Sequence, residues 1–94
     1  MSMQGDVLST YLASSGSVST NRNRLKSVSY RGNGTLGSLV FKDGGASGTA
    51  LLELSVGTGD TVTNYVILPG EGVLFGSNIY AVLTNVSAAT VFYG

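Results

Sequence analysis

Carboxylates are the side chains of this 94-residue chain best suited to acid–base chemistry, because histidine and cysteine are both absent. That absence excludes a Ser-His-Asp triad, a thiolate nucleophile and the usual zinc site. No two carboxylates are close in sequence, and none belongs to a calcium loop. Three of them fall in glycine-rich turns, where acidic residues make local hydrogen bonds. The five carboxylates are Asp6, Asp43, Glu53, Asp60 and Glu71. We therefore expect no enzymatic activity, no metal site and no cofactor.

Four of the five basic residues lie within ten positions, at Arg22, Arg24, Lys26 and Arg31. Aromatic residues do not alternate with them, as a stacking platform for nucleic-acid bases requires. A net charge of zero also argues against nonspecific binding to nucleic acid or to an anionic membrane. The two favoured interpretations are a solvated edge strand and a patch that docks on an acidic protein surface. Binding to nucleic acid is less favoured than either.

Tyrosine is more frequent than phenylalanine, and tyrosines can line a protein interface or a sugar site. A sugar site would use exposed tyrosines on one sheet face, with Tyr65 and Tyr80 as its candidates. The alternative is that the tyrosines lie at the margin of the core with their hydroxyls in water. The absence of tryptophan, which sugar sites favour, argues against the sugar site.

Two glycine-rich segments, 32–34 and 57–59, superficially resemble loops that bind phosphate. Phosphate loops depend on a following helix, whose N-terminal N–H groups point at the anion. Each segment here is followed by residues that indicate another strand. Hairpin turns are therefore the better interpretation.

The chain is short enough for one domain and divides into two zones. Residues 1–23 are rich in Ser and Thr, and we expect them to form an N-terminal arm that docks on a partner. Its apolar residues, whose spacing fits a helical stripe or an extended segment, are Val7, Leu8, Tyr11 and Leu12. Residues 24–94 are a succession of short apolar segments, and we expect them to form the folded domain.

Apolar and polar residues alternate with a period of two through most of 24–94. Leu39 and Phe41 share one side of a strand, and 50, 52, 54 and 56 form the clearest inward row of another. Glycine-rich turns such as 43–45 separate the segments. About seven short strands after the arm predict an all-β fold, a small antiparallel sandwich of jelly-roll type with 7–8 strands.

The order of several motifs resembles small structural (decoration-type) proteins of tailed-bacteriophage virions, especially those of aquatic and cyanobacterial phages. The resemblance covers residues 24–94. The motifs that carry it are Arg24-Leu25-Lys26-Ser27-Val28, Lys42-Asp43-Gly44-Gly45, Leu68-Pro69-Gly70-Glu71-Gly72, Ile79-Tyr80-Ala81-Val82-Leu83 and Val91-Phe92-Tyr93-Gly94.

This resemblance implies a β-sandwich that docks in many copies on a symmetric phage particle, on the capsid or on the portal–tail complex. The implied partners are other virion proteins, and the implied location is the virion after synthesis in the host cytoplasm. The basic cluster would then meet an acidic surface, and the apolar residues of the arm would fill a groove on the partner. The alternative function is a carbohydrate-binding module for host surface glycans.

Overall fold

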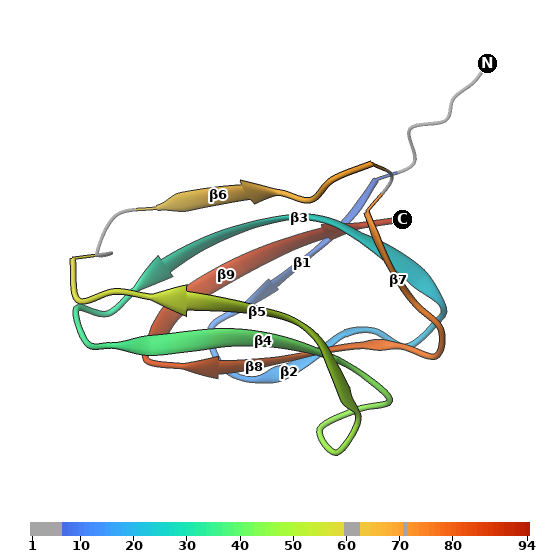
Figure 1. Ribbon diagram of the computed structural model, residues 1–94, viewed down its shortest axis with the longest axis horizontal. Coiled ribbons are helices and arrows are strands. Elements are labelled where there is room, and N and C mark those ends of the chain that lie inside the picture. Colours follow the sequence, from blue (N-terminus) through green and yellow to red (C-terminus); the bar gives the residue numbers. More distant parts are fainter. Residues whose placement is uncertain (1–6, 60–62, 71) are drawn as a thin grey trace.

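Nine β-strands form in the part of the chain that the computed structural model describes, residues 7–59, 63–70 and 72–94, and no helix forms there (Figure 1). The strands are β1 (Leu8–Leu12), β2 (Gly16–Ser19), β3 (Asn23–Gly32), β4 (Gly37–Asp43), β5 (Thr49–Val56), β6 (Asn64–Ile67), β7 (Val73–Phe75), β8 (Ile79–Thr84) and β9 (Val86–Tyr93). Seven of them follow residue 23 or begin at it, as the alternation predicted.

The strands form two antiparallel sheets packed face to face (Figure 1). The first sheet has the order β1-β9-β3-β6, with β7 also paired to β3, and the second has the order β2-β8-β4-β5. The pairs β4–β5, β3–β6, β2–β8 and β1–β9 are nested, so that each pair encloses the previous one along the chain. This nesting is the jelly-roll order, with β7 as an additional short strand. The predicted antiparallel β-sandwich is confirmed.

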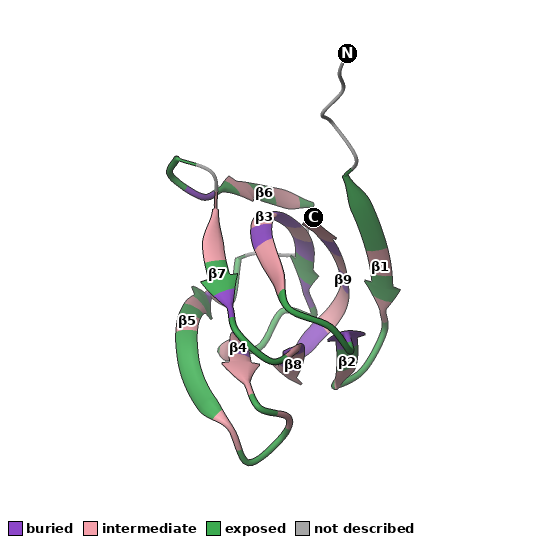
Figure 2. Ribbon diagram, turned by 90° about the vertical axis from the view of Figure 1, so that its right-hand side faces the viewer, coloured by how far each residue is buried: buried purple, intermediate pink, exposed green. Residues whose placement is uncertain are grey.

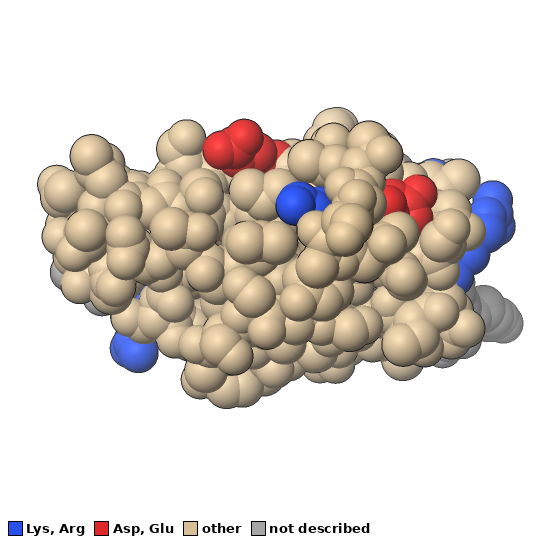
Figure 3. All heavy atoms as spheres, turned by 90° about the horizontal axis from the view of Figure 1, so that it is seen from below, with Lys and Arg blue, Asp and Glu red and all other residues tan. Residues whose placement is uncertain are grey.

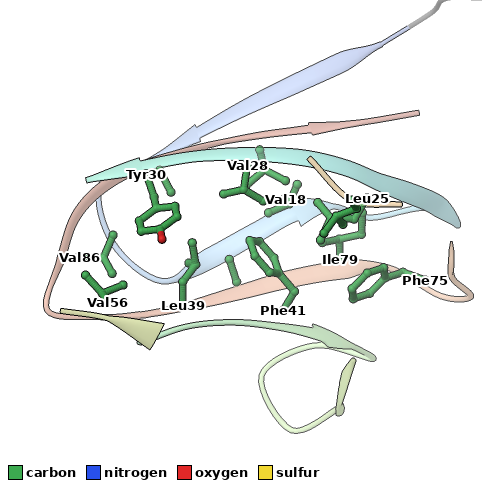
Figure 4. Packing of buried hydrophobic residues seen from close by; sticks show 14 residues of the cluster. Val18, Leu25, Val28, Tyr30, Leu39, Phe41, Val56, Phe75, Ile79 and Val86 are labelled. Carbon is green, nitrogen blue, oxygen red and sulfur yellow. The ribbon is translucent and has the colours of Figure 1, made fainter. Parts of the chain in front are cut away.

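The core lies between the sheets and is built from alternate residues of the strands (Figure 4). Leu39 and Phe41 of β4 are fully buried, as their spacing predicted. Opposite them, β3 contributes Leu25 and Val28, which are also fully buried. Figure 2 shows buried residues on strands of both sheets.

The inward row predicted along β5 is confirmed for most of its length. Val56 is buried, and Leu52 and Leu54 pack against the core. Ala50 is exposed, because the pairing of β4 with β5 shifts register between Phe41 and Lys42. The shift moves the start of β5 away from the core.

Much of the segment expected to form a separate arm belongs to the sandwich. β1 pairs with β9 as the edge of the first sheet, and β2 pairs with β8 as the edge of the second. The Thr10 hydroxyl donates to the Val18 carbonyl oxygen at 3.0 Å and so links the two edges. The boundary expected after residue 23 therefore does not separate an arm from the domain in the part described. Residues 1–6 lie outside the described residues.

A β-bulge interrupts β3 close to its start. The register between β3 and β9 shifts between Leu25 and Ser27, which leaves Lys26 as the extra residue. Strict alternation predicts that Lys26 shares a face with Val28 and Tyr30, yet Lys26 is half-buried while the other two are buried. The bulge keeps Leu25 and Val28 in the core although three positions separate them.

Candidate functional site

The outer surface of the first sheet carries two rows of uncharged side chains. Paired residues of antiparallel strands point to the same side, so the register defines each row across β1, β9, β3 and β6. The rows, which together we call the hydroxyl–aromatic face, are Tyr11-Thr90-Ser29-Tyr65 and Ser9-Phe92-Ser27-Ile67. Three of these side chains are largely exposed: Tyr11 at 66%, Tyr65 at 58% and Ile67 at 72%.

Tyr65 is fixed on this face by contacts with two neighbours. Its hydroxyl donates to the Ser27 hydroxyl oxygen at 3.0 Å. Its ring meets Phe92 edge to face, with centroids 6.4 Å apart and an interplanar angle of 77°. The ring is therefore held in place while more than half of its side chain stays in contact with solvent.

An open pocket of about 600 Å³ adjoins the hydroxyl–aromatic face, and we call it the β3–β6 pocket. It forms because β3 changes partner: Ser27 to Tyr30 pair with β6, whereas Asn23 to Leu25 pair with β7. The pocket is lined by Arg24 and Lys26 of β3, Tyr65 and Ile67 of β6, and Gly70 and Gly72 of the connection to β7. Arg24 and Lys26 are two positions apart on β3, so alternation places them on the same side of the strand, where both line the pocket.

The two cations in the β3–β6 pocket have no side-chain partner among the described residues. Arg24 and Lys26 take part in backbone hydrogen bonds, with Gly94 and Leu68 respectively. No described carboxylate lies within ion-pair distance of either side chain. Both residues are half-buried.

The predicted basic cluster is divided by the fold. Arg24 and Lys26 share the β3–β6 pocket, whereas Arg31 lines a smaller hollow of about 230 Å³ with Tyr11, near the other end of β3. Arg22 is exposed just before β3 begins. The rise along a strand, about 3.3 Å per residue, places Arg31 roughly 17 Å from Lys26. The four residues therefore do not form one patch.

The four apolar residues near the amino terminus also differ in their surroundings. Leu12 packs against the core, whereas Leu8 and Val7 are about half exposed and Tyr11 belongs to the hydroxyl–aromatic face. Figure 2 shows that β1 is exposed along most of its length. Tyr11 is thus the member of this set best placed for a partner.

The two tyrosines expected to form a sugar site do not share a sheet. Tyr65 is on β6 of the first sheet, and Tyr80 is half-buried on β8 of the second. Tyr30 is buried within the core at 8% exposure, and so does not lie at the margin of the core. The register instead places Tyr11 and Tyr65 in one row, which alternation alone could not predict because it does not give strand order.

The outer surface of the second sheet carries few charged side chains (Figure 3). Lys42 donates to the Ala46 carbonyl oxygen at 3.0 Å, within the β4–β5 connection. Among the described residues, no group of three or more carboxylates is placed to hold a metal ion. Asp6, Asp60 and Glu71 lie outside the described residues.

Asp43 has a structural role at the end of β4. Its carboxylate accepts hydrogen bonds from the backbone N–H groups of Gly76, Ser77 and Asn78, at 3.0, 2.9 and 3.4 Å. In return, the Asn78 side-chain oxygen accepts from the N–H groups of Gly44 and Gly45, both at 3.0 Å. The hydrogen bond from Ser77, followed by those from Gly76 and Asn78, holds the pKa of the Asp43 carboxyl below its ordinary value of 3.8, although partial desolvation acts to raise it.

We expect the Asp43→Asn substitution to weaken the acid dependence of stability. A lowered folded-state pKa means that the ionised carboxylate favours folding. This contribution is complete well above pH 3.8 and is lost as the pH falls through the lower folded-state value. Urea unfolding measured between about pH 7 and about pH 2 should therefore show a smaller fall in the free energy of unfolding for the variant than for the wild type. A fall in the free energy of unfolding of Asp43→Asn as large as that of the wild type over this pH range would contradict this role for Asp43.

Comparisons with known proteins found no match to this chain among family models, curated proteins or solved structures. Among the described residues there is also no helix long and apolar enough to span a membrane.

Proposed function

We propose that this protein is a non-enzymatic structural component of a tailed-phage particle and that it docks on other virion proteins through the hydroxyl–aromatic face. The observation that carries the docking is the exposure of Tyr11, Tyr65 and Ile67 together on the hydroxyl–aromatic face. Exposed apolar patches on a rigid surface mark interaction sites, and tyrosine is enriched at interfaces. The phage particle is proposed from the sequence resemblance, and jelly rolls are among the folds that build viral shells.

Docking in many copies is consistent with this surface. A symmetric particle presents the same site repeatedly, so one rigid face on a small domain is sufficient for attachment at every site. The second sheet, with few charges on its outer surface, remains available for contacts between neighbouring copies (Figure 3). The partner is therefore proposed to be the capsid lattice or the portal–tail complex.

The test is association of the purified protein with purified particles of the phage that encodes it, measured by cosedimentation. We expect the wild type to bind, and either Tyr11→Ser or Ile67→Ser to weaken binding at least about tenfold, the loss typical of an interface hot spot. Leu51→Ser is the matched control, because Leu51 is an exposed leucine of the second sheet, at 42%. High stoichiometry would indicate the capsid, and a small number of copies set by the tail axis would indicate the portal–tail complex.

Three results would contradict the proposal: no cosedimentation of the wild type, full binding by both variants, or a loss in Leu51→Ser as large as theirs. A thermal melt of each variant checks that it is folded. All three side chains are more than 40% exposed, so their replacement should leave the core intact.

The second candidate function is a carbohydrate-binding module for host surface glycans. One observation favours it: Tyr65 presents a fixed, exposed ring beside serine and threonine hydroxyls, as sugar-stacking surfaces do. Glycan-array binding that is lost in Tyr65→Ala, together with no association with particles, would replace the first proposal by this one.

A further inference from the structure

We propose that the β3–β6 pocket binds a carboxylate of an acidic, extended segment of a protein partner, with Arg24 and Lys26 as the residues that hold it. This inference rests on the proposed docking function and specifies the chemistry of the partner. The bound group is an Asp or Glu side chain, and the segment that carries it lies along β6.

The first support is that the two cations have no side-chain partner among the described residues. Arg24 and Lys26 line the same pocket, and no described residue forms an ion pair or side-chain hydrogen bond with either. Both are half-buried. Two like charges in such a place repel each other, and a bound anion relieves that repulsion. The guanidinium can also hold a carboxylate through two parallel hydrogen bonds.

The second support is the limited extent of this positive charge. Nucleic acid needs a track of cations along successive phosphates. Beyond Lys26, the next basic residue on β3 is Arg31, at the other end of the strand and in a different hollow. The other described residues that line the pocket are uncharged and include the exposed Tyr65 and Ile67. A pair of cations beside apolar side chains suits one acidic residue flanked by apolar ones.

The third support is the position of β6 at the edge of its sheet. β6 pairs with β3 and has no strand on its other side in the described part of the chain. An exposed sheet edge can accept an extended peptide as an additional strand, which gains main-chain hydrogen bonds. A segment added there would run past the pocket and place an acidic side chain near Arg24 and Lys26. This edge favours a protein segment over an acidic sugar.

The test is fluorescence anisotropy of the full chain with a labelled synthetic peptide of alternating Glu and Thr, amidated at its C-terminus. A peptide of alternating Gln and Thr is the uncharged probe, and an oligomer of galacturonic acid is the acidic-sugar probe. We expect the Glu peptide to bind and the Arg24→Gln/Lys26→Gln variant to bind it about tenfold more weakly. The matched control, Arg31→Gln, removes a cation from the same strand and should change affinity less than about twofold.

A second measurement locates the binding site on the wild type and so does not require the double variant to fold. Amide chemical shifts of the wild type, followed during the same titration, should change at residues 24–27 and 65–68 and not on β4 or β5. Because Glu71 lies between two lining glycines in sequence and is outside the described residues, both titrations are repeated with Glu71→Gln, so that no carboxylate of the chain itself competes with the probe.

Four results would overturn the inference: no binding of the Glu peptide in either background, equal binding of the Gln peptide, binding of the galacturonate oligomer alone, or shifts centred elsewhere. Failure of the proposed function is a separate result. If the wild type does not associate with particles but binds the Glu peptide at this pocket, the phage proposal fails and the acidic-segment site stands. If it associates with particles but does not bind the peptide, only the present inference fails.

Discussion

Replacement of Phe75 by alanine is expected to lower the free energy of unfolding by about 3–5 kcal/mol, the usual loss for a fully buried phenylalanine. Phe75 is 0% exposed although β7 has three residues, and it belongs to the same buried cluster as Leu25 and Ile79 (Figure 4). Small domains are stable by about 5–15 kcal/mol, so this loss is a large fraction of the total. Urea unfolding at neutral pH measures it.

Leu74→Ala is the matched control for Phe75→Ala. Leu74 is the preceding residue of β7 and is 37% exposed. Its truncation removes less buried surface than truncation of Phe75, and we expect a loss of about 1 kcal/mol. Similar losses in the two variants would show that β7 is not attached to the core as described.

The second large effect is expected for Gly72→Ala, which should destabilise the protein by about 3 kcal/mol or more and alter the β3–β6 pocket. Gly72 has a φ of +93°, a conformation that residues with a Cβ rarely adopt. A Cβ at this position would also overlap the Leu25 carbonyl oxygen of β3. The strain of such a backbone costs about 1–3 kcal/mol, and the overlap adds to it by forcing β3 and the β6–β7 connection apart. Unfolding in urea gives the magnitude.

Gly70→Ala separates the effect of backbone strain from the effect of steric overlap. Gly70 also has a positive φ, +62°, but a Cβ there would meet no atom within 4 Å. It should therefore show backbone strain alone, about 1 kcal/mol. If Gly72→Ala is no more destabilising than Gly70→Ala, the connection does not lie against β3 as closely as the structure indicates.

The strands of the domain could be predicted because their burial follows sequence alternation. Leu39 and Phe41 face the core on β4, and Leu52 and Leu54 do so on β5. The β1 and β2 strands were missed because the Ser- and Thr-rich segment carries few apolar residues. Its pairing depends on Val18, Leu12 and the Thr10 hydrogen bond, and none of these gives a local pattern of period two.

The candidate site could be predicted only in part. The clustering of basic residues in sequence was apparent, but the change of partner along β3 has no local signal. It opens a pocket beside Arg24 and Lys26, while Arg31 lines a different hollow. The row that joins Tyr11 to Tyr65 depends on strands distant in sequence being neighbours in the sheet. Strand order arises from tertiary packing, so alternation within one strand cannot specify it.

The nested strand pairs have a kinetic consequence. Asp43 and Thr49 are partners in the innermost pair, 6 positions apart (43 to 49), whereas Leu8 and Tyr93 are partners in the outermost, 85 positions apart (8 to 93). Loop-closure entropy makes the outermost pair about 2 kcal/mol harder to close from the unfolded chain. Folding is therefore expected to begin at the β4–β5 hairpin and to proceed outward, with β1 added last.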